Sequence, residues 1–474
     1  MNIIQKPKIY NILEELDKND ILYVCWKDMD LFEDVLVGKK DLDILILNKD
    51  RQKIIALAEK VGFLELKNSF EVSDNLMHLY LADGASIVYH IHIYFQLITG
   101  ESWLKEFHIP IEDELLRDRV WNEPHQLWVL PDDLAQELLI LRHFLKTTSL
   151  VSSFVYKKKR AKAQQYLSVL NNQLSENIFR NIAFYLGDDS IELRACELNV
   201  PNYFTAIKIR RKMSKYKRLN KLNIIKNRYH HLFLRIQKKY LLKEKKIFLN
   251  DGIILAFTGV DGSGKSSLIE HTESFYSRFL TTKKLHMGRP YPTFVNSIWR
   301  ILKSKKIKEQ SNISKLSTPI WKCVFAYILV KIRLKRACYA KKLAKKGYLV
   351  LVDRWPTWEL GKMDGPRIKF HSKSNFLVRL LGEREREIYQ NFKMADICII
   401  LKVSSSHALE RNHDRVKVNK ETQDEILERF ETNNVFNPRA HNVIEFDNSI
   451  ELEHAEISII SQSWIAMSKL IKGC

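Results

Sequence analysis

The sequence predicts an α/β protein whose C-terminal half holds a parallel sheet covered by helices and whose N-terminal part is a smaller α+β domain. From residue 247 onward, short apolar runs alternate with long segments of helical spacing, which is typical of parallel strands joined by helices. One of these runs leads into a glycine-rich turn that ends in Lys-Ser. Before residue 126, short strand-like runs and amphipathic segments are mixed. We therefore expect two folded domains with a helical region between them.

The first expected domain, residues 1–125, alternates helices with strands. Apolar residues at helical spacing predict helices, and short runs of β-branched or aromatic residues predict strands. Glycines at 38 and 62 mark a turn and the end of a helix. The expected helices cover residues 9–16 and 51–61, and the expected strands cover residues 21–25, 41–47, 78–80 and 87–95.

The middle region, residues 126–246, is expected to be mostly helical and ends in a strongly basic segment. Between residues 208 and 246, sixteen Lys and Arg residues face one acid, Glu244, which accounts for a net +15 of the chain's +21. Four aromatic residues are interleaved: Tyr216, Tyr229, Phe233 and Tyr240. We interpret the segment as a solvated basic helix that links two domains. The alternative is contact with an anionic membrane surface or nucleic acid.

Composition indicates a folded protein, with 45% hydrophobic and 28% charged residues. No apolar run approaches the ~18 residues of a membrane span, and the first ten residues lack a hydrophobic signal core. The six cysteines form no C-x-x-C pair, which argues for reduced thiols and against a zinc site. We expect the protein in the cytoplasm, with peripheral membrane contact as a secondary expectation.

A phosphate-binding loop is predicted where the strand over residues 253–257 meets the helix over residues 266–279. Gly259, Gly264, Lys265 and Ser266 fit the pattern G-x-x-x-x-G-K-[ST]. Glycines permit positive φ angles, and the loop amides and helix N-terminus present partial positive charge to phosphates. We expect ATP and Mg²⁺ here, with Lys265 on the phosphates and the Ser266 hydroxyl on Mg²⁺. The other residues expected to contact phosphate are Gly262, Ser263 and Ser267.

The last expected domain, residues 247–474, continues with strands over residues 348–352, 397–403 and 443–446 and a long helix over residues 320–345. In a sheet of this kind, ligands bind at the carboxyl ends of the strands. Asp353 and Arg354 directly follow one of these ends. A carboxylate and a guanidinium there suit phosphoryl transfer, although Asp353 is also explained as an ordinary strand-end carboxylate.

Three segments of this domain resemble the thymidylate kinase family, in the family's order, over roughly residues 250–474. Residues 257–267 resemble its phosphate loop, residues 347–355 its strand ending in Asp-Arg-aromatic, and residues 395–411 its Pro-Asp strand and lid arginine. The resemblance implies a kinase in which Asp353 holds Mg²⁺ through water or orients the acceptor, and Arg354 neutralises the transferring phosphate. It also implies that Asp261 orients the acceptor. Arg411 and Arg415 would close over the γ-phosphate, unless Arg411 lies on a solvated helix face.

The acceptor side departs from that family. Thymidylate kinases carry a Ser-x-x-Ala-Tyr-Gln segment after the Asp-Arg-aromatic motif, and residues 356–367 contain no match to it. The donor side is therefore kept while the acceptor side is rebuilt. We do not expect thymidylate to be the substrate.

The N-terminal domain carries a second candidate site. Asp41 and Asp43 lie two apart on an expected strand, so their side chains share a face that suits a divalent cation. The stretch from Gly38 through Asp43 resembles the Gly…Asp-x-Asp signature of the nucleotidyltransferase fold. Members of that fold add a third carboxylate from a neighbouring strand, where this chain has His90 and His92. We expect these four side chains to converge on a metal ion; the alternative is a pair of core histidines in a domain without chemistry.

These observations favour an ATP-dependent kinase with an accessory nucleotidyltransferase-like domain. The expected acceptor is a sugar, a glycan precursor or an unusual nucleotide. Similar fusions resemble proteins of bacterial surface-polysaccharide pathways, which favours a glycan. The second hypothesis is a nucleotide-gated nucleic-acid-binding protein with a regulatory or defence role, in which the basic segment is the working surface.

Overall fold

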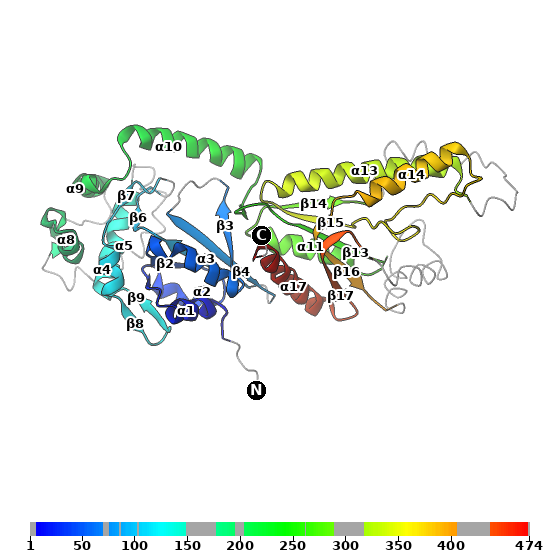
Figure 1. Cartoon of the computed structure of the whole chain (residues 1–474). Coiled ribbons are helices and arrows are strands. Elements are labelled where there is room, and N and C mark those ends of the chain that lie inside the picture. The colour runs from blue at the N-terminus through cyan, green and yellow to red at the C-terminus, as the bar shows by residue number, and fades with distance from the viewer. Residues whose placement is uncertain are drawn as a thin grey trace. The chain divides into compact units, whose positions relative to one another are not determined.

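The computed structural model describes residues 6–69, 75–84, 87–101, 104–147, 177–194, 203–260, 262–288, 317–404 and 437–472. The chain divides into two compact units, Met1–Asp83 with Ile87–Glu244, and Gly84–Ser86 with Lys245–Cys474. Each unit has a sheet covered by helices, which confirms the predicted α/β class (Figure 1). Within the described ranges, no helix combines the length and apolar character needed to cross a bilayer.

The first unit is built on a mixed sheet with the strand order β3-β4-β5-β2-β1-β9-β8. Two neighbouring pairs are parallel, β2 with β5 and β1 with β9, and the other pairs are antiparallel. The parallel pairing of β2 and β5 places Asp43 directly opposite His92. The strands are β1 (Tyr23–Cys25), β2 (Leu42–Ile46), β3 (Leu64–Asn68), β4 (Leu76–Asp83), β5 (Ile87–Tyr94), β8 (Val120–Asn122) and β9 (Leu127–Val129).

Helices cover both faces of this sheet, because successive strand residues point to opposite sides. Tyr23 and Cys25 pack in one buried cluster with α1 (Ile9–Lys18) and α3 (Arg51–Lys60). Val24 and Trp26 pack in a second cluster on the other face. The helices of that face are α4 (Glu112–Arg117), α5 (Asp132–Lys146), α8 (Arg180–Leu186) and α9 (Tyr203–Lys212).

The basic segment of the middle region is helical. It comprises the end of α9, a 3-10 turn over Met213–Tyr216, α10 (Lys221–Leu234) and a π-helical turn over Arg235–Leu241. The Asn220 side chain caps α10 by accepting a hydrogen bond from the Asn223 amide at 2.8 Å. The helical form of the segment agrees with the helix predicted from the sequence.

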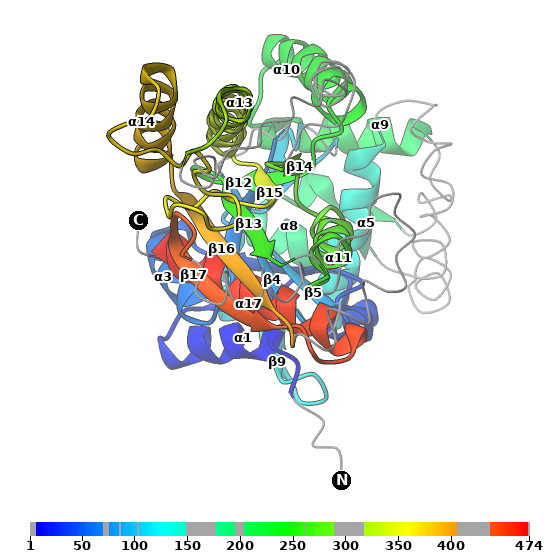
Figure 2. The ribbon, with the colours of Figure 1, turned by 90° about the vertical axis from the view of Figure 1, so that its right-hand side faces the viewer.

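The second unit is a parallel sheet with the strand order β14-β15-β13-β16-β17. Its strands are β13 (Ile254–Gly259), β14 (Thr282–His286), β15 (Leu349–Asp353), β16 (Ala395–Lys402) and β17 (Ala440–Asp447). Figure 2 shows α13 (Ile320–Ala344) and α14 (Phe376–Gln390) on one side of this sheet, and α11 (Lys265–Tyr276) and α17 (Leu452–Lys472) on the other. Every strand expected from the sequence in this domain is present, and β14 is an additional one.

The candidate site lies at the carboxyl end of β13, the central strand of this sheet. The next two strands along the chain lie on one side of β13, and the last two lie on the other. Open α/β sheets bind ligands where the strand order reverses in this way. At its carboxyl end, Gly259 has φ +151° and lies so close to β16 that an added Cβ would meet the Leu401 carbonyl oxygen at 2.6 Å. Only glycine fits this close approach.

Candidate phosphate and metal sites

The predicted phosphate loop joins β13 to α11. Gly262 and Gly264 have φ angles of +94° and +83°, which residues with a Cβ adopt only with strain. Lys265 begins α11, and its Nζ donates hydrogen bonds to the carbonyl oxygens of Gly259 at 2.8 Å and Val260 at 2.7 Å. The loop therefore keeps the ammonium charge against its own backbone, at the N-terminus of a helix where anions are favoured.

Polar groups of the loop are held from the far edge of the sheet. Asn448 Nδ2 donates to the Ser263 carbonyl oxygen at 2.7 Å. The Ser263 hydroxyl is buried and has no hydrogen-bond partner among the described residues. Ser266 and Ser267 are exposed on the first turn of α11. Asp261, expected to orient the acceptor, lies outside the described residues.

Asp353, at the end of β15, is paired with a histidine that the sequence analysis missed. His286 ends β14, and its Nδ1 lies 2.9 Å from Asp353 Oδ2. Burial raises the pKa of the Asp353 carboxyl, but the hydrogen bond with His286 and the nearby charges of His286, Arg354 and Lys265 outweigh burial, so that its pKa lies below its ordinary value. Asp353 is therefore ionised at neutral pH.

The other oxygen of Asp353 matters for ligand binding. Asp353 Oδ1 is buried, and no described residue bonds it. Buried polar atoms in proteins normally have a partner, so that an ionised oxygen left open invites a cation or a hydroxyl group. Together with the positive-φ glycines and Lys265, this oxygen fits a phosphate chain with a divalent ion, for which carboxylate and hydroxyl oxygens are the preferred ligands.

Arg354 is held in place by a second, buried arginine. Arg354 has φ +71°, a conformation that costs roughly 1–3 kcal/mol in a residue other than glycine. Its Nη1 lies 3.3 Å from Asp364 Oδ2, and Asp364 Oδ1 accepts from Arg333 Nη2 at 2.6 Å. Arg333, 1% exposed, also donates to the Tyr389 hydroxyl and the Met287 carbonyl. The buried Arg333 therefore helps to set the position of the half-buried Arg354 through the carboxylate of Asp364.

The segment over residues 356–367, in which the sequence analysis found no match to the thymidylate kinase motif, is held by several hydrogen bonds. Arg333 Nη1 donates to the Asp364 carbonyl oxygen at 3.0 Å. Glu385 on α14 accepts from the backbone amides of Arg367 at 3.1 Å and Ile368 at 2.9 Å. Trp358 on the same segment is 51% exposed. The loop over residues 356–367 is therefore held by hydrogen bonds and carries an exposed aromatic side chain. Arg411 and Arg415, expected to close over the γ-phosphate, lie outside the described residues.

In the first unit, three of the four expected metal ligands lie together. Ligand atoms of Asp41, Asp43 and His92 all lie within 4.8 Å of one another. Asp41 directly precedes β2 instead of lying within it. His90, expected as the fourth ligand, is not part of this group: its Nε2 lies 3.0 Å from His78 Nδ1. The register of β4 places His78 opposite His92, and from there the His78 ring reaches His90 with ring centres 5.2 Å apart.

The Asp43 carboxylate of this group already forms an ion pair with a lysine. Lys27 Nζ lies 2.5 Å from Asp43 Oδ1, and His92 Nδ1 lies 3.1 Å from the same oxygen. Burial lowers the pKa of Lys27, but Tyr94 and Asp43 outweigh it, so that its pKa lies above its ordinary value and the ammonium stays charged. A cavity of about 140 Å³ opens beside Lys27 and Trp26. A metal ion that binds the Asp43 carboxylate must therefore compete with the Lys27 ammonium.

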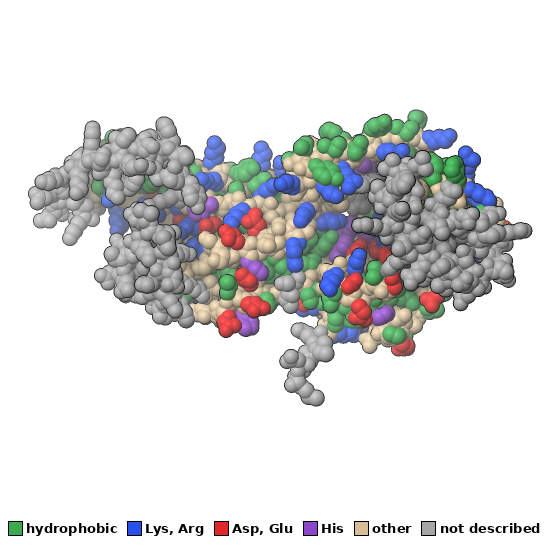
Figure 3. Space-filling model, turned by 180° about the vertical axis from the view of Figure 1, so that it is seen from behind, with side chains coloured by type: hydrophobic (Ala, Val, Ile, Leu, Met, Phe, Trp, Pro, Cys, Tyr) green, Lys and Arg blue, Asp and Glu red, His purple; other side chains and the backbone are tan. Residues whose placement is uncertain are grey.

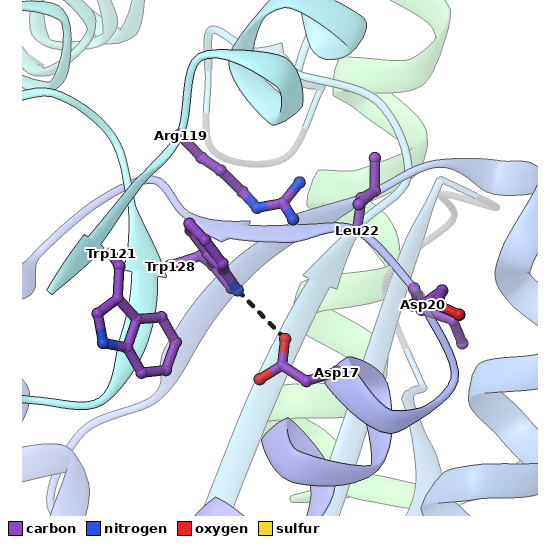
Figure 4. A pocket seen from close by; sticks show the side chains of 7 residues that line it. Asp17, Asp20, Leu22, Arg119, Trp121 and Trp128 are labelled. Atoms are coloured by element: carbon purple, nitrogen blue, oxygen red, sulfur yellow. Dashed lines mark hydrogen bonds between the residues drawn. The ribbon is translucent and has the colours of Figure 1, made fainter. Parts of the chain in front are cut away.

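A larger pocket lies elsewhere on this unit and was not expected from the sequence. It has a volume of about 430 Å³ and lies between the end of α1 and the hairpin of β8 and β9 (Figure 4). The Arg119 guanidinium lies 4.4 Å from the centre of the Trp128 ring, and Trp128 Nε1 donates to Asp17 at 3.2 Å. Trp121 meets Trp128 edge-on at 5.2 Å. The residues that line this pocket come from segments about a hundred positions apart, so that no local sequence pattern could indicate the pocket.

Comparison with known proteins finds distant relatives. The chain matches no established family profile. An Escherichia coli K12 protein named "Uncharacterized ATP-binding protein YghR" is 27% identical over 175 residues, which cover 34% of this chain and 69% of the relative. A second K12 protein, "Uncharacterized ATP-binding protein YghS", is 24% identical over 156 residues, which cover 29% of this chain and 62% of the relative. The chain is similar to these proteins over about a third of its length.

Replacing Arg333 with methionine should destabilise the second unit. The substitution leaves Asp364 charged and buried without its main partner, and breaking such a pair typically costs about 3–5 kcal/mol. The free energy of unfolding, measured with urea on the full chain, should fall by that amount. Lys335→Met, on the exposed side of the same helix, is the control and should change stability by less than about 0.5 kcal/mol. Equal stability of the two variants would contradict the role assigned to Arg333.

Replacing Lys27 with methionine should raise the affinity of the first unit for Mn²⁺. The variant removes the ammonium that competes for Asp43, and we expect at least a tenfold gain, about 1.4 kcal/mol. A mixed carboxylate and imidazole set suits Mn²⁺ better than Mg²⁺. The measurement is calorimetry on the full chain without nucleotide. The Asp41→Asn, Asp43→Asn double variant should lose this metal binding and keep ATP binding, and unchanged Mn²⁺ affinity in both variants would exclude the site.

Proposed function

We propose that the second unit is an ATP-dependent phosphotransferase that uses Mg²⁺. The observation that carries this proposal is the position of Asp353, whose open carboxylate oxygen lies at the end of the strand paired with the phosphate-loop strand. The positive charge of Lys265 contributes to the lowered pKa of this carboxylate. The names of the two distant relatives support ATP as the nucleotide. Together these features support transfer of a phosphoryl group at this edge of the sheet.

The residues around the loop divide into donor and transfer roles. Backbone amides of residues 262–265 and the Lys265 ammonium bind the phosphates. The Ser266 hydroxyl and Asp353 would hold Mg²⁺, which neutralises charge on the transferred group when it is bound. Arg354, fixed by Asp364, places a guanidinium at the strand end, where it stabilises charge that grows in the transition state.

The proposed reaction moves one phosphoryl group to a hydroxyl. The acceptor oxygen forms a bond to the γ-phosphorus while the bond to the bridging oxygen of ADP breaks. The hydroxyl proton is released to water as the bond to phosphorus forms, because the lowered pKa of Asp353 makes this carboxylate a weak base. His286, bonded to the other oxygen of Asp353, orients the carboxylate and stabilises its ionised form.

The acceptor is proposed to be a sugar, a glycan precursor or an unusual nucleotide rather than thymidylate. The loop over residues 356–367 carries no thymidylate motif, yet it is ordered by Arg333 and Glu385 and presents Trp358. An exposed aromatic ring suits the apolar face of a sugar or a base. Among pathways, we favour bacterial surface-polysaccharide synthesis, which supplies acceptors of this class.

For the first unit we propose a nucleotidyltransferase-like domain with a divalent-metal site at Asp41, Asp43 and His92. The burial of Asp43 and its ion pair with Lys27 support a site in which the lysine withdraws when a metal-bound nucleotide enters. With histidine in place of the third carboxylate, this site carries less negative charge than the sites of that fold.

Replacing Lys265 with alanine should abolish phosphoryl transfer. The substitution removes the point charge that binds the phosphates, and we expect ADP formation to fall at least about 100-fold. ADP release is measured with ATP, Mg²⁺ and a panel of sugars and nucleotides. Lys342→Ala, at an exposed position of α13, is the matched control and should keep full activity. If Lys265→Ala stays folded and turns over as fast as wild type, the phosphate loop is not the donor site.

Thymidylate should be a poor acceptor, because the segment that binds it in thymidylate kinases is missing. We expect turnover with thymidylate to lie far below the ~10 s⁻¹ typical of enzymes. The same ADP assay measures it, with the best acceptor of the panel as the positive control. Turnover near the typical value would mean that the loop over residues 356–367 binds thymidylate by other contacts.

A further inference from the structure

The helix α10 and the π-helical turn that follows it carry their apolar side chains on the outside. Apolar residues recur every three or four positions over residues 222–240, which forms one stripe along the helix. The stripe consists of Leu222, Ile225, Tyr229, Leu232, Ile236 and Tyr240, each between 48% and 78% exposed. A helix on a protein surface normally turns such a stripe toward the core, so that this orientation requires a partner.

The opposite, polar face attaches the helix to its unit. Arg228 Nη2 pairs with Glu101 at 2.6 Å, and Lys238 Nζ donates to the Ser69 carbonyl oxygen at 2.6 Å. His231 is 8% exposed on this side. These contacts fix the rotation of the helix about its axis. The outward position of the stripe is therefore a consequence of specific polar contacts, and the unit holds the helix in this orientation.

The charged residues of the helix are all basic. Residues 221–241 contain six Lys and Arg residues and no acid. Lys221, Lys226 and Lys239 are exposed beside the apolar stripe. Figure 3 shows hydrophobic and basic side chains together along the outer edge of this part of the unit. Lysine stems lie along apolar surfaces while their ammonium groups reach the polar layer.

We propose that α10 and its π-helical turn dock on the surface of an anionic lipid bilayer. The apolar stripe enters the boundary between head groups and acyl chains, and the lysines and arginines lie at the lipid phosphates. The aliphatic residues decide between this partner and nucleic acid: phosphates and bases gain little from Leu222, Ile225, Leu232 or Ile236, whereas a bilayer interface accommodates them. The helix lies in the plane of the membrane and does not span it.

Sedimentation of the full chain with lipid vesicles tests this proposal. The protein should bind vesicles of phosphatidylcholine mixed with phosphatidylglycerol and should bind pure phosphatidylcholine much more weakly. Raising the salt concentration should weaken the binding, because it screens the attraction to anionic lipid. The double variant Ile225→Asp, Leu232→Asp should bind at least about tenfold more weakly, because it places charges where the stripe enters the lipid.

Two control variants separate the contributions. Phe184→Asp changes another exposed apolar residue of the same unit, 77% exposed on α8, and should leave vesicle binding unchanged. Lys221→Gln with Lys226→Gln keeps the stripe and should reduce binding to anionic vesicles about tenfold. All four proteins should keep the same circular dichroism spectrum, since the changed side chains are exposed.

Four results would overturn the proposal. The wild-type chain fails to sediment with anionic vesicles, or the Ile225→Asp, Leu232→Asp variant binds them as tightly as Phe184→Asp does. Alternatively, light scattering shows a wild-type dimer that this variant abolishes, while vesicle binding is absent, which would assign the stripe to a second copy of the chain. Salt-dependent binding to duplex DNA or RNA without vesicle binding would assign the helix to nucleic acid.

Discussion

The parallel hydrogen bonding of β13 to β15 and β16 is the constraint on which the candidate phosphate site depends. Because all three strands run in one direction, their carboxyl ends meet at one edge of the sheet. That edge brings together the glycine turn after β13 and Asp353 at the end of β15. The same pairing forces Gly259 against the backbone of β16, so that the loop turns where the strand order reverses.

The position of Arg354 depends on a buried ion pair. Arg333 has its donors satisfied inside the unit, and its carboxylate partner Asp364 also reaches Arg354. Such a pair adds little net stability compared with apolar packing, yet it is costly to break. What it contributes is position, since it holds a strained arginine at the end of β15. His286 does the same for Asp353, and it also keeps the pKa of that carboxyl low.

The first unit uses charge in the opposite way. Its buried carboxylate, Asp43, is ion-paired with Lys27 and lies 3.1 Å from His92 Nδ1, whereas Asp353 keeps one oxygen without a partner among the described residues. A resident ammonium stabilises the folded domain and at the same time sets a threshold that an incoming metal ion must exceed. On the outside of this unit, one ion pair and one hydrogen bond to the backbone hold α10 with its apolar stripe turned outward.

The sequence by itself determined the local features of this protein. Periodicity located the helices α11 and α13 and four of the five strands of the second unit's sheet. Contiguous spacing located the phosphate loop and the pair Asp41 and Asp43, because these features depend on neighbouring residues. Tertiary structure alone decided which distant side chains meet. His286 bonds Asp353 from 67 positions away. His78 on β4 bonds His90, which therefore does not join Asp41, Asp43 and His92. The outward rotation of α10 belongs to the same class, since contacts with Glu101 and Ser69 set it. Strand register and helix rotation arise from packing between segments far apart in the chain, and no local period records them.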